Sequence, residues 1–200
     1  MDRIEICRAC SEAFDQQEKL VAAFDTIHVN SIPFDGSWTA GQVVQHTIMA
    51  NGGFLEMLNG EMTDTGRPSD LIVPRIASDF LDFSTKMDAP ESLVPENILY
   101  EPAVLLQKVQ HIYAGLRFVI ENLDLTKTCV ECELPGYGFL TRMEAVYFIV
   151  CHTKRHNYQL ENIIRLLSEG TKTNIFGWLV FEFLSHSGDR LATDHTPIFW

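Results

Sequence analysis

The sequence has few basic residues and no apolar run long enough to span a bilayer, which takes about 20 residues in a helix. It opens Met1-Asp2-Arg3-Ile4-Glu5, without the apolar core of an export signal. Only 15 Lys and Arg stand against 27 Asp and Glu, so the formal net charge is −12. General binding to nucleic acid needs a basic surface, and this balance argues against it. We therefore expect a cytoplasmic protein with no membrane partner and no nucleic-acid partner.

Cysteine is also scarce, and its count of five is odd. In a chain without an export signal, this favours reduced thiols. Cys7 with Cys10 and Cys129 with Cys132 form two CxxC pairs, but compact zinc modules hold such pairs roughly 15–20 residues apart. The spacing here is far longer, so the first pair is interpreted as small apolar residues on a helix and the second as a chance feature of a connection. A four-cysteine zinc site is the lesser alternative.

What the sequence does contain is helical periodicity. Apolar residues recur at the spacing of an amphipathic helix in four long segments. Two of these segments begin with a capping box, Thr39 with Gln42 and Thr141 with Glu144, in which each side chain bonds the other residue's backbone amide. The third segment starts after Pro102, which favours a helical first turn. The four predicted helices cover residues 2–27, 39–59, 103–123 and 141–167.

The connections between these segments predict the fold class. Residues 61–100 form a long, proline-containing crossover with a short helix at about Ile76 to Lys86, which lets the helices before and after it run parallel. Residues 124–140 allow at most a short strand. We therefore predict an all-α four-helix bundle over residues 1–167, with a long crossover between helices two and three. Ser168-Glu169-Gly170 predicts the end of the last helix. The aromatic C-terminal extension, residues 168–200, is expected to pack on the bundle or at a dimer contact.

Three histidines lie on the apolar faces of these helices. His152 and His156 are four residues apart on the last helix, so both side chains point the same way, and His46 lies on the second. Each alone is more often a core histidine, and an ordinary bundle with three such residues is the alternative. Together they predict a divalent metal site with an open position, the arrangement typical of catalysis. Zinc and nickel come first, with copper and iron also suited to imidazole. Neither Glu-x-x-His nor His-Glu-x-x-His occurs, which argues against di-iron and zincin chemistry.

The two histidine segments resemble the motifs of a known family. Residues 38–46, WTAGQVVQH, are similar to the opening and first histidine of the DinB-like (DNA-damage-inducible protein B) superfamily, and His152-x-x-x-His156-x-x-Gln159-Leu160 is similar to its closing motif. The resemblance covers residues 1–167 in order and spacing. It implies a bundle with a three-histidine divalent metal site, frequent homodimers, and relatives that are transferases or isomerases dependent on bacillithiol, mycothiol or glutathione.

The chain departs from the family pattern after the last histidine. Asn157 and Tyr158 replace an Arg-Gly pair that is frequent there, which weakens any transfer of an anion-binding role. If Tyr158 faces the site, it narrows the access or adds a phenol. Gln42, Tyr158 and Gln159 are candidates to hydrogen-bond the metal ligands. Cys151 is expected to pack against a helix. The other histidines are expected in solvent or at a boundary: His28, His111, His186 and His195.

Two functional hypotheses follow. The first is a metal-dependent enzyme of small molecules, in which the ion activates a thiol or water for transfer, isomerisation or hydrolysis. A low-molecular-weight thiol is then the expected second cofactor. The second is a non-catalytic, dimeric binding or stress-response module with a vestigial metal site. An open, solvent-connected coordination position favours the enzyme, and a fourth protein ligand or a sealed core favours the module.

Overall fold

The computed structural model describes residues 1–181, with side chains as far as residue 169. Helices dominate this part of the chain, and the strands form one small two-stranded sheet. In chain order the elements are α1 (Arg3–Ala22), η1 (His28–Asn30), α2 (Ala40–Asn59), β1 (Met62–Thr63), α3 (Val73–Leu81), η2 (Glu91–Leu93), α4 (Pro102–Asn122), β2 (Thr128–Cys129) and α5 (Arg142–Phe181). The predicted all-α class is confirmed.

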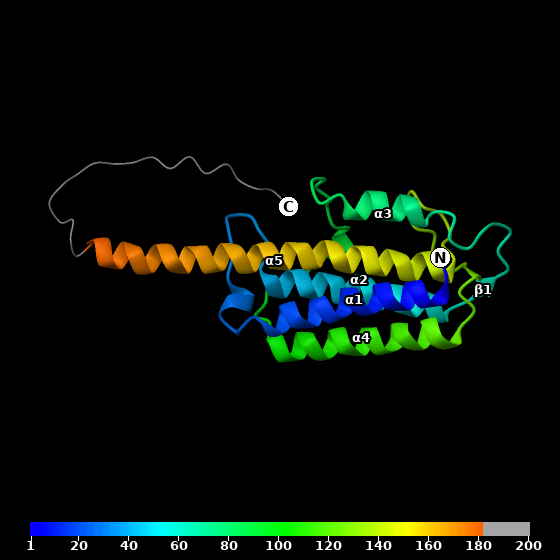
Figure 1. Cartoon of the computed structure of the whole chain (residues 1–200), viewed down its shortest axis with the longest axis horizontal. Coiled ribbons are helices and arrows are strands. Elements are labelled where there is room, and N and C mark those ends of the chain that lie inside the picture. Colours follow the sequence, from blue (N-terminus) through cyan, green and yellow to red (C-terminus); the bar gives the residue numbers. More distant parts are fainter. Residues whose placement is uncertain (182–200) are drawn as a thin grey trace.

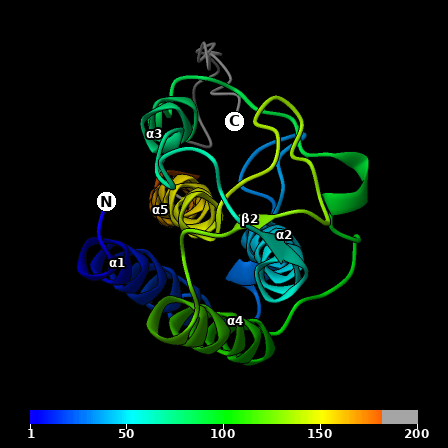
Figure 2. The ribbon, with the colours of Figure 1, turned by 90° about the vertical axis from the view of Figure 1, so that its right-hand side faces the viewer.

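The helices α1, α2, α4 and α5 lie side by side as a bundle, and α3 packs on the outer face of α5 (Figures 1 and 2). The small sheet closes one end of this bundle. Its strands pair antiparallel, with Met62 opposite Cys129 and Thr63 opposite Thr128. Because β1 follows α2 and β2 follows α4, both helices finish at this end and run parallel, as the long crossover predicts. The crossover between them carries α3 and η2.

Both predicted capping boxes are present. At α2, the Thr39 hydroxyl accepts from the Gln42 amide, and the Gln42 side chain accepts from the Thr39 amide. At α5, Thr141 and Glu144 exchange the same two bonds, at 3.0 and 3.1 Å. Each cap satisfies backbone donors that a helix start leaves without intrahelical partners. The caps therefore set the starting residues of the two helices that carry the three histidines.

Two predicted ends of the bundle helices are wrong, and the crossover helix runs from Val73 to Leu81 instead of from about Ile76 to Lys86. The first helix stops at Ala22 instead of Ile27. The Asp25 carboxylate accepts from the backbone amides of Ile27 and His28, and this local bonding replaces the helical pattern. The last helix does not stop at residues 168–170 but continues to Phe181. A glycine inside a helix costs only about 1 kcal/mol, so Gly170 by itself does not end one.

The far part of α5 extends past the ends of the other helices of the bundle (Figure 1). The packing predicted for residues 168–200, on the bundle or at a dimer contact, stays a prediction. Most of the apolar run at 175–184 falls in this helical extension, while residues 182–200, which include His186 and His195, lie outside the described residues. No described helix holds a stretch long and apolar enough to cross a membrane.

A single core fills the space between the bundle helices. Fully buried side chains come from α1, α2, α4 and α5, and Phe14 of α1 stacks on Tyr113 of α4 at 5.1 Å between ring centroids. The largest buried side chains are Phe14, Ile6, Leu58, Ile76, Leu105, Leu116, Ile120, Leu140, Ile149, Leu160 and Ile163. Ile76 is the residue that α3 contributes, so the crossover helix is anchored in this core.

Candidate metal centre

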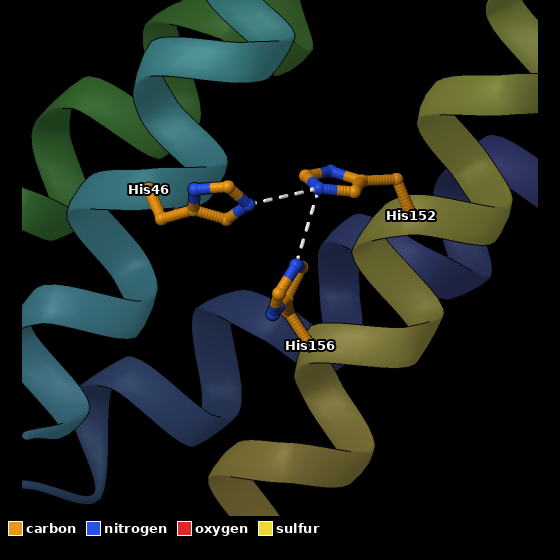
Figure 3. Close-up of side chains that lie close together, drawn as sticks. All are labelled: His46, His152 and His156. Atoms are coloured by element: carbon orange, nitrogen blue, oxygen red, sulfur yellow. Dashed lines mark hydrogen bonds between the residues drawn. The ribbon is translucent and has the colours of Figure 1, made fainter. Parts of the chain in front are cut away.

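The three predicted histidines converge in the structure. His46 extends from α2, and His152 and His156 extend from successive turns of α5, with all three rings pointing toward one point (Figure 3). His46 and His152 are buried, and His156 is partly buried. Burial of three imidazoles at one point is costly unless their polar atoms are satisfied. The described chain therefore holds a buried three-histidine group that could bind a metal ion.

The distances between the ring nitrogens fit such an ion. The Nε2 atom of His152 lies 3.2 Å from Nε2 of His46 and 3.1 Å from Nε2 of His156. All three ligand atoms lie within 4.8 Å of one another. Nitrogens bound to one tetrahedral zinc ion at about 2.0–2.1 Å stand about 3.3 Å apart. Two of the three separations are already close to this value.

Oxygen acceptors hold the other nitrogen of each ring. His46 Nδ1 donates to the carbonyl oxygen of Leu93 at 2.8 Å. His152 Nδ1 donates to Asn51 Oδ1 at 3.3 Å, and His156 Nδ1 donates to Gln159 Oε1 at 2.8 Å. An acceptor opposite Nδ1 places the ring proton there and leaves the Nε2 lone pair free for a metal. The Leu93 carbonyl requires this tautomer of His46, and the amide oxygens of Asn51 and Gln159 favour it for His152 and His156.

Burial keeps the rings neutral. Desolvation lowers the pKa of His46, and it lowers the pKa of His152 well below the ordinary 6.5, with the neighbouring His156 and His46 adding to the effect. For His156, desolvation and the proximity of His46 lower the pKa to about 3. A neutral imidazole is the form that coordinates metal. Near neutral pH the group therefore needs no deprotonation before it can bind an ion.

These shifts predict that the chelator-treated protein loses stability on mild acidification. Below pH 6.5 the unfolded chain protonates His156, whereas the folded chain does so only near pH 3. The unfolded state then binds more protons, so the stability present above pH 6.5 falls as the pH falls. From His156 alone we expect a loss of about 2 kcal/mol between about pH 6.5 and pH 5. Urea unfolding with a chelator present measures it.

The matched control is a His152→Gln/His156→Gln variant, which lacks the two most strongly shifted groups. Its unfolding free energy should depend much less on pH over the same interval. An equal slope in both proteins would show that other groups cause the acid sensitivity.

Aromatic side chains surround the three rings. Trp38 lies 5.3 Å from His46 between ring centroids, and Phe80 and Phe148 each lie 6.2 Å from His152. Trp38 and Phe80 are only partly buried, whereas Phe148 is buried. No described Asp, Glu or Cys joins the histidine group as a fourth ligand. Aromatic rings therefore line part of the site, and coordination is left to the three imidazoles.

The crossover is tied to the histidine helix next to the site. The Arg155 guanidinium donates to three backbone oxygens of the crossover, those of Phe80 and Asp82 at 3.3 and 2.9 Å and that of Thr85. Tyr158 stacks on Phe83 with ring centroids 4.6 Å apart. Together with the Leu93 carbonyl on His46, these contacts hold residues 80–93 against the two histidine helices beside the site.

The structure separates the predicted supporting residues. Gln159 does hydrogen-bond His156. Gln42 does not contact a histidine, because its side chain is used in the α2 cap. The Tyr158 ring stacks on Phe83 of the crossover instead of supporting a histidine. Asn157, the other departure from the family pattern, is buried and donates to the Ala13 carbonyl of α1.

Two supporting groups were missed by sequence reasoning. The Leu93 carbonyl has no sequence signal, since every residue carries a carbonyl. Asn51 has a weak one, as an amide that stands among apolar residues on a helix face. Its Nδ2 donates to Thr153 at 3.1 Å, which turns Oδ1 toward His152.

The remaining candidates lie away from the site. His28 and His111 are exposed, and His28 pairs with Asp25. Cys10 and Cys151 are buried on helices, and burial raises their thiol pKa values to about 12 and about 11. The two CxxC pairs do not come together: within residues 1–181, no group of cysteines has metal-binding geometry.

Comparison with known proteins supplies the family. No curated protein and no solved structure matches the chain. The family model described as the DinB superfamily matches residues 10–160, which include all three histidines, the whole of α2 and the part of α5 that carries His152 and His156. The match covers most of the chain and agrees with the bundle, the crossover and the position of the histidine group. The chain therefore belongs to the DinB superfamily.

Proposed function

We propose that this protein is a metal-dependent enzyme of small molecules, with a divalent ion held by His46, His152 and His156. The observation that carries the proposal is the convergence of three Nε2 atoms whose Nδ1 partners are all acceptors. Three neutral lone pairs facing one another need a shared cation. Zinc and nickel are the ions we place first, since imidazole suits both.

The absence of a fourth protein ligand in the described chain supports catalysis over a structural role. Catalytic metal sites keep a position for water or substrate, whereas structural zinc sites are closed by four protein ligands. A bound divalent ion supplies Lewis-acid chemistry that lowers the pKa of a thiol or a water. The reaction class is therefore thiol transfer, thiol-dependent isomerisation or hydrolysis, with a low-molecular-weight thiol as the proposed second cofactor.

The chain's own residues have three tasks in this proposal. The histidines fix the ion, and Leu93, Asn51 and Gln159 fix the histidines. The aromatic wall limits water around the reacting group and favours an apolar or aromatic part of a substrate. A homodimer and a small-molecule substrate belong to the same proposal.

The test has two stages on protein purified without a histidine tag. Metal analysis should find about one ion per chain. The ion is then replaced by cobalt(II), whose visible spectrum reports its coordination, and 2-mercaptoethanol is added. We expect the spectrum to change, because the thiol enters the open position and sulfur is a soft ligand.

A spectrum unchanged by excess thiol, azide and cyanide would contradict the open position. The competing function would then be preferred, a non-catalytic dimeric module whose metal is structural. Both functions would be ruled out if the purified protein held no stoichiometric metal and took up no zinc, nickel or cobalt in equilibrium dialysis. The three histidines would then be residues of an ordinary core.

A further inference from the structure

Behind the histidine group, polar side chains form a ring through three helices. Gln17 of α1 donates to Thr47 of α2 at 2.9 Å. Asn51, one turn further on α2, donates to Thr153 of α5 at 3.1 Å. Asn157, one turn further on α5, donates at 2.8 Å to the carbonyl of Ala13 on α1, one turn before Gln17. The three interhelical hydrogen bonds therefore join α1 to α2, α2 to α5 and α5 to α1 inside the core.

The ring is buried throughout. Gln17, Thr47 and Thr153 are 0% exposed, Asn51 is 2% exposed and Asn157 is 4% exposed. It adjoins the candidate metal centre directly, because Thr47, Thr153 and Asn157 each follow one of the three histidines in the sequence. The Asn51 amide belongs both to the polar ring and to the candidate metal centre, since its oxygen also accepts from His152.

Two oxygens in the ring lack a hydrogen-bond donor. Among the described residues, neither Gln17 Oε1 nor Asn157 Oδ1 has a partner, although both atoms are buried. Buried carbonyl oxygens are almost always paired with protein or ordered water, because an unpaired one has lost its solvation without compensation. Each of these oxygens therefore requires a donor.

Reversing the amides does not supply one. Asn157 faces a backbone carbonyl, which only accepts, so its nitrogen has to point there. The Thr47 hydroxyl donates to the Val44 carbonyl at 2.8 Å, so its oxygen only accepts from Gln17. The Gln17 nitrogen is thus also required where it is. Both orphan oxygens are fixed by their neighbours and are not errors of amide orientation.

Gln17 and the point where Asn157 contacts α1 lie one helical turn apart. In a helix the carbonyl of one residue points at the amide of the residue four positions later, so the Ala13 carbonyl lies against the Gln17 amide. The Asn157 side chain docks on that carbonyl. The Gln17 and Asn157 amides therefore both lie beside this stretch of α1, where one position can serve the two oxygens.

We infer that this position binds one internal water molecule, which donates to Gln17 Oε1 and Asn157 Oδ1. Two acceptors match the two protons of water, and buried waters occur where two or more polar groups need partners. A cation is disfavoured, because two neutral oxygens without a carboxylate do not offset its loss of hydration. The water closes the polar ring that holds Asn51, and through Asn51 the tautomer of His152. The role of Asn51 in metal binding by His152 rests on the proposed function, whereas the water site does not.

A crystal structure of the full chain, at a resolution that places ordered waters and with metal removed by a chelator, tests the site. We expect one density peak within hydrogen-bond distance of both oxygens. A dry position, or two oxygens bonded to other side chains, would overturn the inference. Because the protein is metal-free, this result does not depend on whether the three histidines bind an ion.

A double-mutant cycle tests the same site in solution. Gln17→Met and Asn157→Leu each remove one acceptor with little change in volume. If one water bridges both oxygens, the first substitution already disrupts its site, so the urea midpoint of the double variant shifts by less than the two single shifts added. Additive shifts would overturn the bridge.

Asn51→Leu tests the link to the histidines. It removes the acceptor on His152, so we expect metal affinity to fall roughly 10–100-fold. Gln17→Met contacts no histidine and serves as the matched control, with a much smaller effect on affinity. Equal losses of affinity in both variants would show that the ring acts only through general stability and overturn the link.

Discussion

A His152→Ala/His156→Ala variant is expected to lose its metal, falling from about one ion per chain to nearly none. Two of the three Nε2 atoms disappear, and His46 alone offers one imidazole on a helix. A single neutral ligand does not compete with hydration of a divalent ion or with buffer. Metal analysis after dialysis, together with the thermal midpoint with and without a chelator, measures the loss.

The matched control is His28→Ala/His111→Ala, which removes the same number of imidazoles from exposed positions. It should keep the metal and the chelator-sensitive midpoint of the unsubstituted protein. Far-ultraviolet circular dichroism verifies that both variants keep their helices. Retention of stoichiometric metal by the His152→Ala/His156→Ala variant would defeat the assignment of the site.

An Arg67→Met variant should be less stable than the unsubstituted protein by about 3 kcal/mol, the lower end of what removing one partner from a buried ion pair costs, because the Arg67 side chain is itself 29% exposed. Arg67 donates from its two terminal guanidinium nitrogens, Nη1 and Nη2, to Glu144 at 2.5 and 2.7 Å, and Glu144 is 0% exposed. The same carboxylate accepts from the amides of Ile72 and Thr141. Without Arg67 this carboxyl group stays buried and has lost the cation that paired with it. Urea unfolding at neutral pH measures the difference.

An exposed ion pair provides the control. Arg117 and Glu121 lie 3.3 Å apart on the surface of α4, with side chains 56% and 51% exposed. Arg117→Met should change the stability little, because solvent screens such a pair. If both substitutions had equal effects, the burial of Glu144 would not be what makes its pairing important.

The Glu144 contacts also show how far local sequence rules extend. The capping box with Thr141 was readable from the spacing of two residue types. That the same carboxylate would bind Arg67 and the Ile72 amide was not readable, because these residues are more than 70 positions away in the sequence. Here one side chain starts a helix and anchors the beginning of the crossover.

Much of the candidate site was predictable because local sequence spacing determines which residues share a helix face. His152 and His156 share a helix face whatever the fold is, since their relation depends only on the helical repeat. Their meeting with His46 depended on α2 packing against α5, which amphipathic patterning suggests and the family motifs support. The groups that hydrogen-bond the three histidines were harder to predict. Of three sequence candidates, only Gln159 reaches a ligand, and it does so within one turn of the helix.

The sequence by itself determined what is local: the starts of α2 and α5, the faces that carry the histidines, and the helical class of the chain. Its rules for helix ends were weaker, since Asp25 ended α1 early and Gly170 did not end α5. Only the tertiary structure decided which distant atoms complete the site, namely the Leu93 carbonyl and the Asn51 amide. Helical periodicity fixes directions over a few residues, whereas hydrogen bonds across the bundle require the packed positions of separate helices.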